Sequence, residues 1–208
     1  MEEKYKVIFL DIDGVLQPYD SKKRFEYRRK FGLESLQQKL TGELGRDYFQ
    51  YDEYDVGACY CDWDKSAVNR IKKILDETGA KIVISSDWRR TNKPEKMHDF
   101  LKIWDLEKYL IGQTLYYDDM EIENPNILKK EKEYILEKIK DKKNDFYDKR
   151  CIEILHYVNT HNIINYVAID DRNLSDLPVG HFVKTYDFIT EEQADKVIEL
   201  LNKKNPKI

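Results

Sequence analysis

Short runs of consecutive apolar residues, each ending abruptly in polar residues, recur along the chain. The first lies within residues 5–10 and runs into Asp-Ile-Asp-Gly at residues 11–14; the others are residues 82–84 and residues 163–169, the last interrupted only by Asn165. An apolar run of this length is typical of a strand that is buried on both faces, as in a parallel sheet. The pattern therefore predicts three buried, parallel strands.

Between these runs the apolar residues follow the spacing of a helix. Four helices are indicated, at residues 64–79, from Pro94 onward, around residues 152–158 and after Thr190, and two shorter strands at residues 109–111 and 181–183. Asp64 suits the N-cap of the first helix and Gly79 its end. Thr190 and Gln193 suit a capping box. Alternating strands and helices predict an α/β fold, with a Rossmann-like parallel sheet and helices on both faces.

Two stretches fall outside this alternation. Residues 17–62 contain leucines 33, 36 and 40 at helical spacing and are predicted to form a helical cap, or lid, inserted after the first strand. Residues 116–148 are highly charged, and a helix is expected within them at residues 127–139. The predicted organisation is therefore an α/β core of residues 1–16 and 63–208, with a cap of residues 17–62 and a charged helical insertion of residues 116–148.

Composition narrows the class of protein. The 208 residues fit one domain, alone or with a small accessory piece. The net charge of −4 gives no global basic field that would call for nucleic acid or an anionic membrane. Three cysteines show no zinc pattern, and no apolar run is long enough for a signal peptide or a membrane span. We expect a cytoplasmic protein with reduced thiols.

Polar side chains gather where the predicted strands end. These are Asp11 and Asp13 after the first, Ser85 and Ser86 after the second, and Asp170 and Asp171 after the third. The carboxyl ends of parallel strands meet at one edge of the sheet, where α/β folds bind ligands. Four carboxylates there repel one another and need a cation, of which Mg²⁺ is the default. A hydroxyl and backbone N–H groups can hold an anion beside that metal.

Three strings at these strand ends resemble a known superfamily. Asp-Ile-Asp-Gly-Val, Ile-Val-Ile-Ser and Ala-Ile-Asp-Asp, in this order, look like motifs I, II and IV of the haloacid dehalogenase (HAD) phosphohydrolases. Residues 85–89, 111–114 and 168–172 are similar to the HAD branch related to the Swiss Army Knife RNA-repair proteins. The resemblance covers the core and not the two insertions. It implies a Mg²⁺-dependent phosphatase that forms an aspartyl-phosphate.

The resemblance also implies roles for the acids. Asp11 would be the nucleophile, and Asp13 would protonate the leaving oxygen and later activate water. Asp11, the backbone carbonyl of Asp13 and Asp170 would hold Mg²⁺. Asp171 would be a further ligand or would hydrogen-bond one. The substrate would be a phosphomonoester, either a small metabolite, a nucleotide or a nucleic-acid end.

The phosphate would need a hydroxyl and a cation. Ser85 is the preferred hydroxyl, with Ser86 as the alternative. Motif III of the superfamily is a Lys or Arg near the start of the helix before motif IV, and a cation there would balance the charge of Asp11 and the phosphate. The candidates are Arg150, which we prefer, and Lys149, Lys129 and Lys130.

Other residues near these motifs have more ordinary interpretations. Arg89 contacts either an anion or a helix end, and Trp88 is expected in the core. Asp176 suits a turn. The four histidines, at positions 98, 156, 161 and 181, show no paired pattern and are expected on the surface or in the core.

Two alternatives to a phosphatase come from other classes. A non-catalytic binding or regulatory module could keep the fold and bind a nucleotide or nucleic acid, but all four acids are present. A phosphoacceptor signalling domain would place its acids differently and would not end its second long strand in Ser. The partner is therefore expected to be a phosphorylated small molecule or a nucleotide. Residues 22–31, which are basic and aromatic, either guide a polyanion such as nucleic acid to the site or form a solvated helix face whose aromatics are buried.

Overall fold

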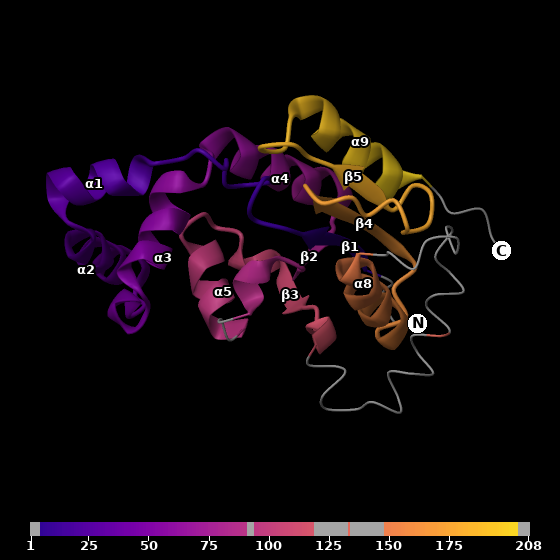
Figure 1. The fold of residues 1–208 in the computed structure, drawn as a ribbon, viewed down its shortest axis with the longest axis horizontal. Helices are drawn as coiled ribbons and strands as arrows, with labels where there is room; N and C mark the ends of the chain where they lie inside the picture. The colour runs from indigo at the N-terminus through magenta and orange to yellow at the C-terminus, as the bar shows by residue number, and fades with distance from the viewer. Residues whose placement is uncertain (1–4, 91–93, 119–132, 134–147, 204–208) are drawn as a thin grey trace.

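The computed structural model, which describes residues 5–90, 94–118, 133 and 148–203, is built on one five-stranded sheet (Figure 1). The strand order is β3-β2-β1-β4-β5, and all neighbours are parallel. The strands are β1 Lys6–Leu10, β2 Lys81–Ile84, β3 Leu110–Gln113, β4 Asn165–Asp170 and β5 Phe182–Lys184. The predicted parallel α/β sheet is confirmed, and the strand that carries Asp-Ile-Asp-Gly lies at its centre.

The central strand is buried on both faces, as its apolar run predicts. Ile8 and Leu10 join a core cluster formed with α4 Lys65–Thr78 and α9 Glu191–Asn202. Val7 and Phe9 join a second cluster formed with α8 Lys149–Thr160. Successive side chains of a strand point to opposite faces. Helices therefore cover both faces of the sheet.

The local signals at the helix ends are also confirmed. The Asp64 carboxylate accepts hydrogen bonds from the backbone N–H groups of residues 66 and 67, at 2.9 and 3.1 Å. Gly79 ends α4 in the left-handed conformation, with φ of +69°. Thr190 and Gln193 form the reciprocal capping box at the start of α9.

The short strand β3 departs from its predicted bounds. Tyr109 belongs to a 3₁₀ turn, η4 Glu107–Tyr109, and Gly112 lies within the strand, which was expected to end there. A Cβ added at Gly112 would lie 2.6 Å from the Tyr157 hydroxyl oxygen. Glycine here lets the Tyr157 side chain pack directly on the strand, and it does not mark a turn.

Residues 23–62 form a set of helices beside the sheet (Figure 1). They are α1 Lys23–Phe31, α2 Leu33–Leu44, η1 Tyr48–Gln50, α3 Glu53–Gly57 and the π-helix η2 Ala58–Asp62. Leu33, Leu36 and Leu40 are buried, as their helical spacing predicts. They pack into the same cluster as the α4 side of the sheet. Their neighbour α5 Pro94–Lys102 supplies Met97 and Phe100 to it.

The helix expected at residues 127–139 lies, apart from Glu133, outside the described residues. So do Lys129 and Lys130, two of the candidates for the cation of motif III. Among the helices that are described, none has the length and apolar content needed to cross a lipid bilayer.

Candidate active site

Backbone hydrogen bonds continue past the strand ends and bring the polar residues together. The N–H of Asp11 donates to the carbonyl of Ile169 at 3.1 Å, and the N–H of Ser85 donates to the carbonyl of Leu10 at 3.0 Å. Asp11, Ser85 and Asp170 are all buried. These backbone hydrogen bonds place the ends of β1, β2 and β4 at one edge of the sheet, as predicted.

Gly14 turns the chain immediately after the two acids of β1. Its φ is +71°, and an added Cβ would lie 2.6 Å from the Tyr19 hydroxyl oxygen and 2.7 Å from Cβ of Asp171. A side chain at this position would be both conformationally strained and in steric conflict. Glycine thus allows the segment after β1 to approach the end of β4.

Asp11, Asp170 and Asp171 form a group that we call the carboxylate cluster. One carboxylate oxygen from each lies within 4.8 Å of the others. Burial, followed by the charge of Asp170, raises the pKa of Asp11 to about 7. Burial also raises the pKa of Asp170. These oxygens are the hard donors that Mg²⁺ prefers, and their mutual repulsion would be relieved by a cation.

Arg150 supplies a positive charge to the cluster. Its Nη1 lies 3.1 Å from Oδ1 of Asp11 and 3.0 Å from Oδ2 of Asp170, while Nη2 lies 2.7 Å from Oδ1 of Asp87. The guanidinium is buried, and the three acids together raise its pKa despite burial. The N-cap residue Asp148 accepts a hydrogen bond from the Arg150 N–H and begins α8. This start of the helix directs Arg150 toward the strand ends.

Lys149 does not reach the carboxylate cluster. Its Nζ lies 2.6 Å from Oδ1 of Asp118, and both side chains are about half exposed. Of the two described candidates for the motif III cation, only Arg150 contacts the acids. Lys149, which pairs with Asp118, is therefore the less suited of these two cations to contact a phosphate at this site.

The two serines differ in their partners. The Ser86 side chain lies near enough to the Asp11 carboxylate to lower its pKa, and the Ser86 Oγ accepts the N–H of Trp88 at 3.3 Å. The Ser85 Oγ is buried and, among the described residues, has no hydrogen-bond partner. A buried hydroxyl without a partner is costly and is often completed by a ligand. The Ser85 hydroxyl can therefore form a further hydrogen bond.

Arg89 holds the backbone of Ser85 and Ser86, which we call the serine loop. Its Nη1 donates to the carbonyls of Ser85 and Ser86, both at 2.6 Å, and its Nε donates to the carbonyl of Thr114 at 3.0 Å. Its Nη2 pairs with the buried Glu153 of α8. All of these contacts are internal. The geometry therefore favours a role that the sequence analysis did not predict for Arg89, positioning of this loop, over contact with an anion or a helix end.

Three residues that hold the acids were missed by sequence reasoning. Trp88, expected only in the core, donates its indole N–H to Oδ2 of Asp13 at 3.0 Å. Gln17 donates to Oδ1 of the same carboxylate at 3.2 Å. The Tyr19 hydroxyl donates to the Asp171 carboxylate. Gln17 and Tyr19 follow the Gly14 turn closely, which was the one available signal; nothing local marks Trp88.

The raised pKa of Asp11 predicts how stability depends on pH. Between about pH 4 and 7 the native protein keeps a proton on Asp11 that the unfolded chain has lost. We therefore expect the free energy of unfolding of the metal-free protein to fall as pH rises through this range. In the Asp11→Asn variant, the free energy of unfolding should lack the decrease that is due to ionisation of Asp11. Urea unfolding with chelator at several pH values measures both, and identical pH slopes for the two proteins would contradict the prediction.

Comparison with known proteins identifies the family of the chain. The model of the HAD domain in Swiss Army Knife RNA repair proteins matches residues 7–194, which include β1, the helices of residues 23–62 and the end of β4. A search of curated proteins finds no match. Since the family match covers far more than half of the chain, the protein belongs to the HAD domain family of the Swiss Army Knife RNA repair proteins.

Proposed function

We propose that this protein hydrolyses phosphomonoesters through a phosphorylated Asp11. Membership of the HAD family implies phosphohydrolase chemistry in general. The observation that carries the proposal is the pairing of Asp11 with Arg150, at 3.1 Å, at the carboxyl end of the central strand. A carboxylate held by a buried cation stays available as a nucleophile despite its burial.

In the first step, an Asp11 carboxylate oxygen attacks the phosphorus, and the bond from phosphorus to the ester oxygen breaks. Asp13 gives a proton to that leaving oxygen. In the second step, Asp13 takes a proton from water, which attacks the phosphorus and releases phosphate from Asp11. Trp88 and Gln17 hold one oxygen of Asp13 each, which fixes the direction of its carboxylate for both proton transfers.

The phosphate would be bound by groups of the serine loop and α8. The Ser85 Oγ, which lacks a partner among the described residues, would donate to a phosphate oxygen. Arg150 would share its charge between Asp11 and the phosphate, because its guanidinium already lies against the nucleophile. Arg89 would hold the loop carbonyls in place without contacting the substrate.

The carboxylate cluster fits a magnesium ion. Its three carboxylate oxygens lie close together, and two of the three side chains are buried. Asp11, Asp170 and the backbone carbonyl of Asp13 would hold the ion, with Asp171 as a further ligand or its hydrogen-bond partner. A bound Mg²⁺ would offset the repulsion between the phosphate and Asp11.

The helices of residues 23–62 would act as the cap that selects the substrate. Asp62 at their end accepts hydrogen bonds from the Ser21 hydroxyl and the Arg24 N–H, at 2.8 and 3.1 Å, which ties both ends of the segment together beside the site. The candidate substrates are a phosphorylated small molecule, a nucleotide and a nucleic-acid end. The family name, which refers to RNA repair, favours the last of these.

A generic aryl phosphate tests the proposed reaction. We expect hydrolysis in the presence of Mg²⁺, loss of activity with chelator and recovery when Mg²⁺ is added back. The Asp170→Ala variant should need more Mg²⁺ or be inactive, because one ligand is lost. Full turnover in chelator would contradict the metal assignment. Absence of turnover on aryl, nucleotide and oligonucleotide phosphates alike would favour the non-catalytic binding module instead.

A further inference from the structure

Helix α1 is the long helix of the described chain that contributes least to the core, since only its half-buried Tyr27 packs against the main core cluster. None of its residues is buried, whereas α2, α4, α8 and α9 each bury one face. The side chains of Phe25 and Phe31 are 43% and 63% exposed. One alternative was that the charged residues of this segment form a solvated helix face while its aromatic residues are buried. For Phe25 and Phe31 that alternative is wrong.

The charge of this segment is opposite to that of the chain. Residues 22–31 carry six cations and one acid, Glu26, in a protein whose net charge is −4. The cations are Lys22, Lys23, Arg24, Arg28, Arg29 and Lys30. Within the described residues, only Arg24 forms an ion pair, with the buried Asp62 at 3.1 Å. Most of this charge is therefore uncompensated and faces solvent.

Arginine and aromatic side chains also lie against one another on this surface. The Arg24 guanidinium carbon lies 5.3 Å from the centroid of the Phe25 ring, and that of Arg28 lies 5.3 Å from the Tyr54 ring. Exposed rings beside arginines provide faces on which unpaired bases stack, while the cations contact the phosphates. An anionic membrane would be attracted by the charge alone, but it would not require such paired rings.

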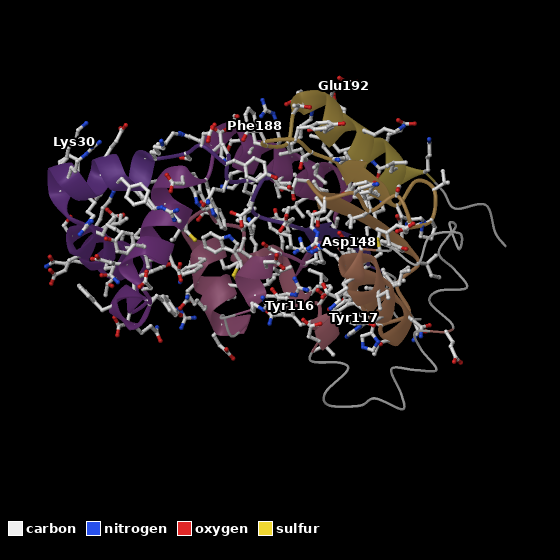
Figure 2. All side chains as sticks on the ribbon, viewed as in Figure 1. Lys30, Tyr116, Tyr117, Asp148, Phe188 and Glu192 are labelled. Atoms are coloured by element: carbon white, nitrogen blue, oxygen red, sulfur yellow. The ribbon has the colours of Figure 1, made fainter. Side chains whose placement is uncertain are left out.

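The start of α1 is close to the candidate active site. The hydroxyl of Tyr19 contacts Asp171, and α1 begins only four residues later, at most about 14 Å along the chain. From there α1 runs outward, and Lys30 lies at the far end of the molecule from Asp148 (Figure 2). The helix therefore extends the surface of the protein away from the carboxylate cluster.

We propose that α1, with Tyr54, is a docking surface for single-stranded nucleic acid whose terminal phosphate lies at Asp11. This proposal rests on the proposed phosphatase function and narrows its substrate to a polynucleotide end. The strand would follow the basic residues along α1, and one or two bases would stack on Phe25 and Phe31.

Charge reversal of Lys23, Arg29 and Lys30 to Glu tests the electrostatic part. These residues are exposed and unpaired among the described residues, and Arg24 is left intact because it balances a buried acid. The same reversal of Lys108, Lys196 and Lys203, which are exposed and lie outside α1, is the control for net charge; Lys196 and Lys203 pair with the exposed Glu199. Both are made in the Asp11→Asn protein, so that the probe is not consumed.

The probe is a fluorescent single-stranded RNA of about 12 nucleotides with a terminal phosphate, and binding is followed by anisotropy over a salt series. The α1 variant should bind at least tenfold more weakly than its parent. Its plot of log affinity against log salt should be flatter by about 2, since each phosphate contact contributes about 0.7 to the slope. The control should behave like the parent. Equal loss in both variants, or no binding by the parent, would overturn the proposal.

Leucine substitutions at Phe25 and Phe31 test the stacking part. We expect affinity for the RNA to fall about tenfold while affinity for inorganic polyphosphate, which has no bases, is unchanged. Equal losses for both probes, or stronger binding of the parent to phosphatidylserine vesicles than to RNA, would reject nucleic acid as the ligand. Hydrolysis of aryl phosphate by the wild-type protein tests the proposed phosphatase activity separately. The outcome of that assay is therefore distinguishable from failure of the nucleic-acid docking proposal.

Discussion

Replacing Asp11 with Asn should lower kcat by several decades while leaving the fold intact. The substitution preserves the size of the side chain and removes the nucleophilic charge, so covalent catalysis and its charge balance with Arg150 are both lost. Steady-state hydrolysis of aryl phosphate with saturating Mg²⁺ measures the effect. Because a buried carboxylate with a raised pKa is removed, the variant should be at least as stable as wild type near pH 7.

Asp105→Asn is a suitable control for this experiment. Asp105 is 86% exposed, and its φ of +55° suits Asn as well as Asp. The control should keep wild-type kcat and stability. If Asp11→Asn were folded and retained activity comparable with Asp105→Asn, Asp11 would not be the nucleophile.

Arg150→Met should have the largest effect on stability. The side chain neutralises Asp11, Asp170 and Asp87 from a buried position, and its removal leaves two buried acids without a cation. Loss of one partner of a buried ion pair costs about 3–5 kcal/mol. The pKa values of Asp11 and Asp170, already raised by burial, should rise further, so that Asp11 would be largely protonated at neutral pH and turnover would stop.

Lys149→Met provides the matched comparison at the neighbouring position. Lys149 is half exposed and pairs with a half-exposed Asp118, so its loss should change the free energy of unfolding by less than about 1 kcal/mol. Urea unfolding in chelator and aryl phosphate hydrolysis with Mg²⁺ measure the two variants. Equal stability and kcat for both variants would show that Arg150 is not the cation of the site.

Residues whose environment is set by nearby sequence were predictable. The apolar runs before Asp11 and Asp170 identified strands because a strand buried on both faces cannot contain exposed polar residues. The capping box of Thr190 and Gln193 was predictable since both partners lie within one turn. The convergence of Asp11, Ser85 and Asp170 at one edge followed from the parallel order alone.

Residues whose role depends on partners far away in the sequence could not be predicted. Trp88 contacts Asp13 across 75 positions, and Tyr19 contacts Asp171 across 152. No pattern within either segment specifies such a contact, which arises only when the loops after β1, β2 and β4 are brought together. The choice between Arg150 and Lys149 likewise depends on the direction of α8, because both are cations at adjacent positions and only one faces the sheet edge.

The central claim, that Asp11 carries the phosphoryl group, can be tested by chemical trapping. Borohydride reduces an aspartyl-phosphate to homoserine. The Asp13→Asn variant should accumulate the intermediate, because an aryl phosphate with an acidic phenol as leaving group needs no proton in the first step, whereas water is no longer activated in the second. After this variant is mixed with aryl phosphate and Mg²⁺ and then reduced, peptide mass spectrometry should find homoserine at position 11, and only when substrate is present. Homoserine at another aspartate, or none at any position while product is still released, would contradict the account.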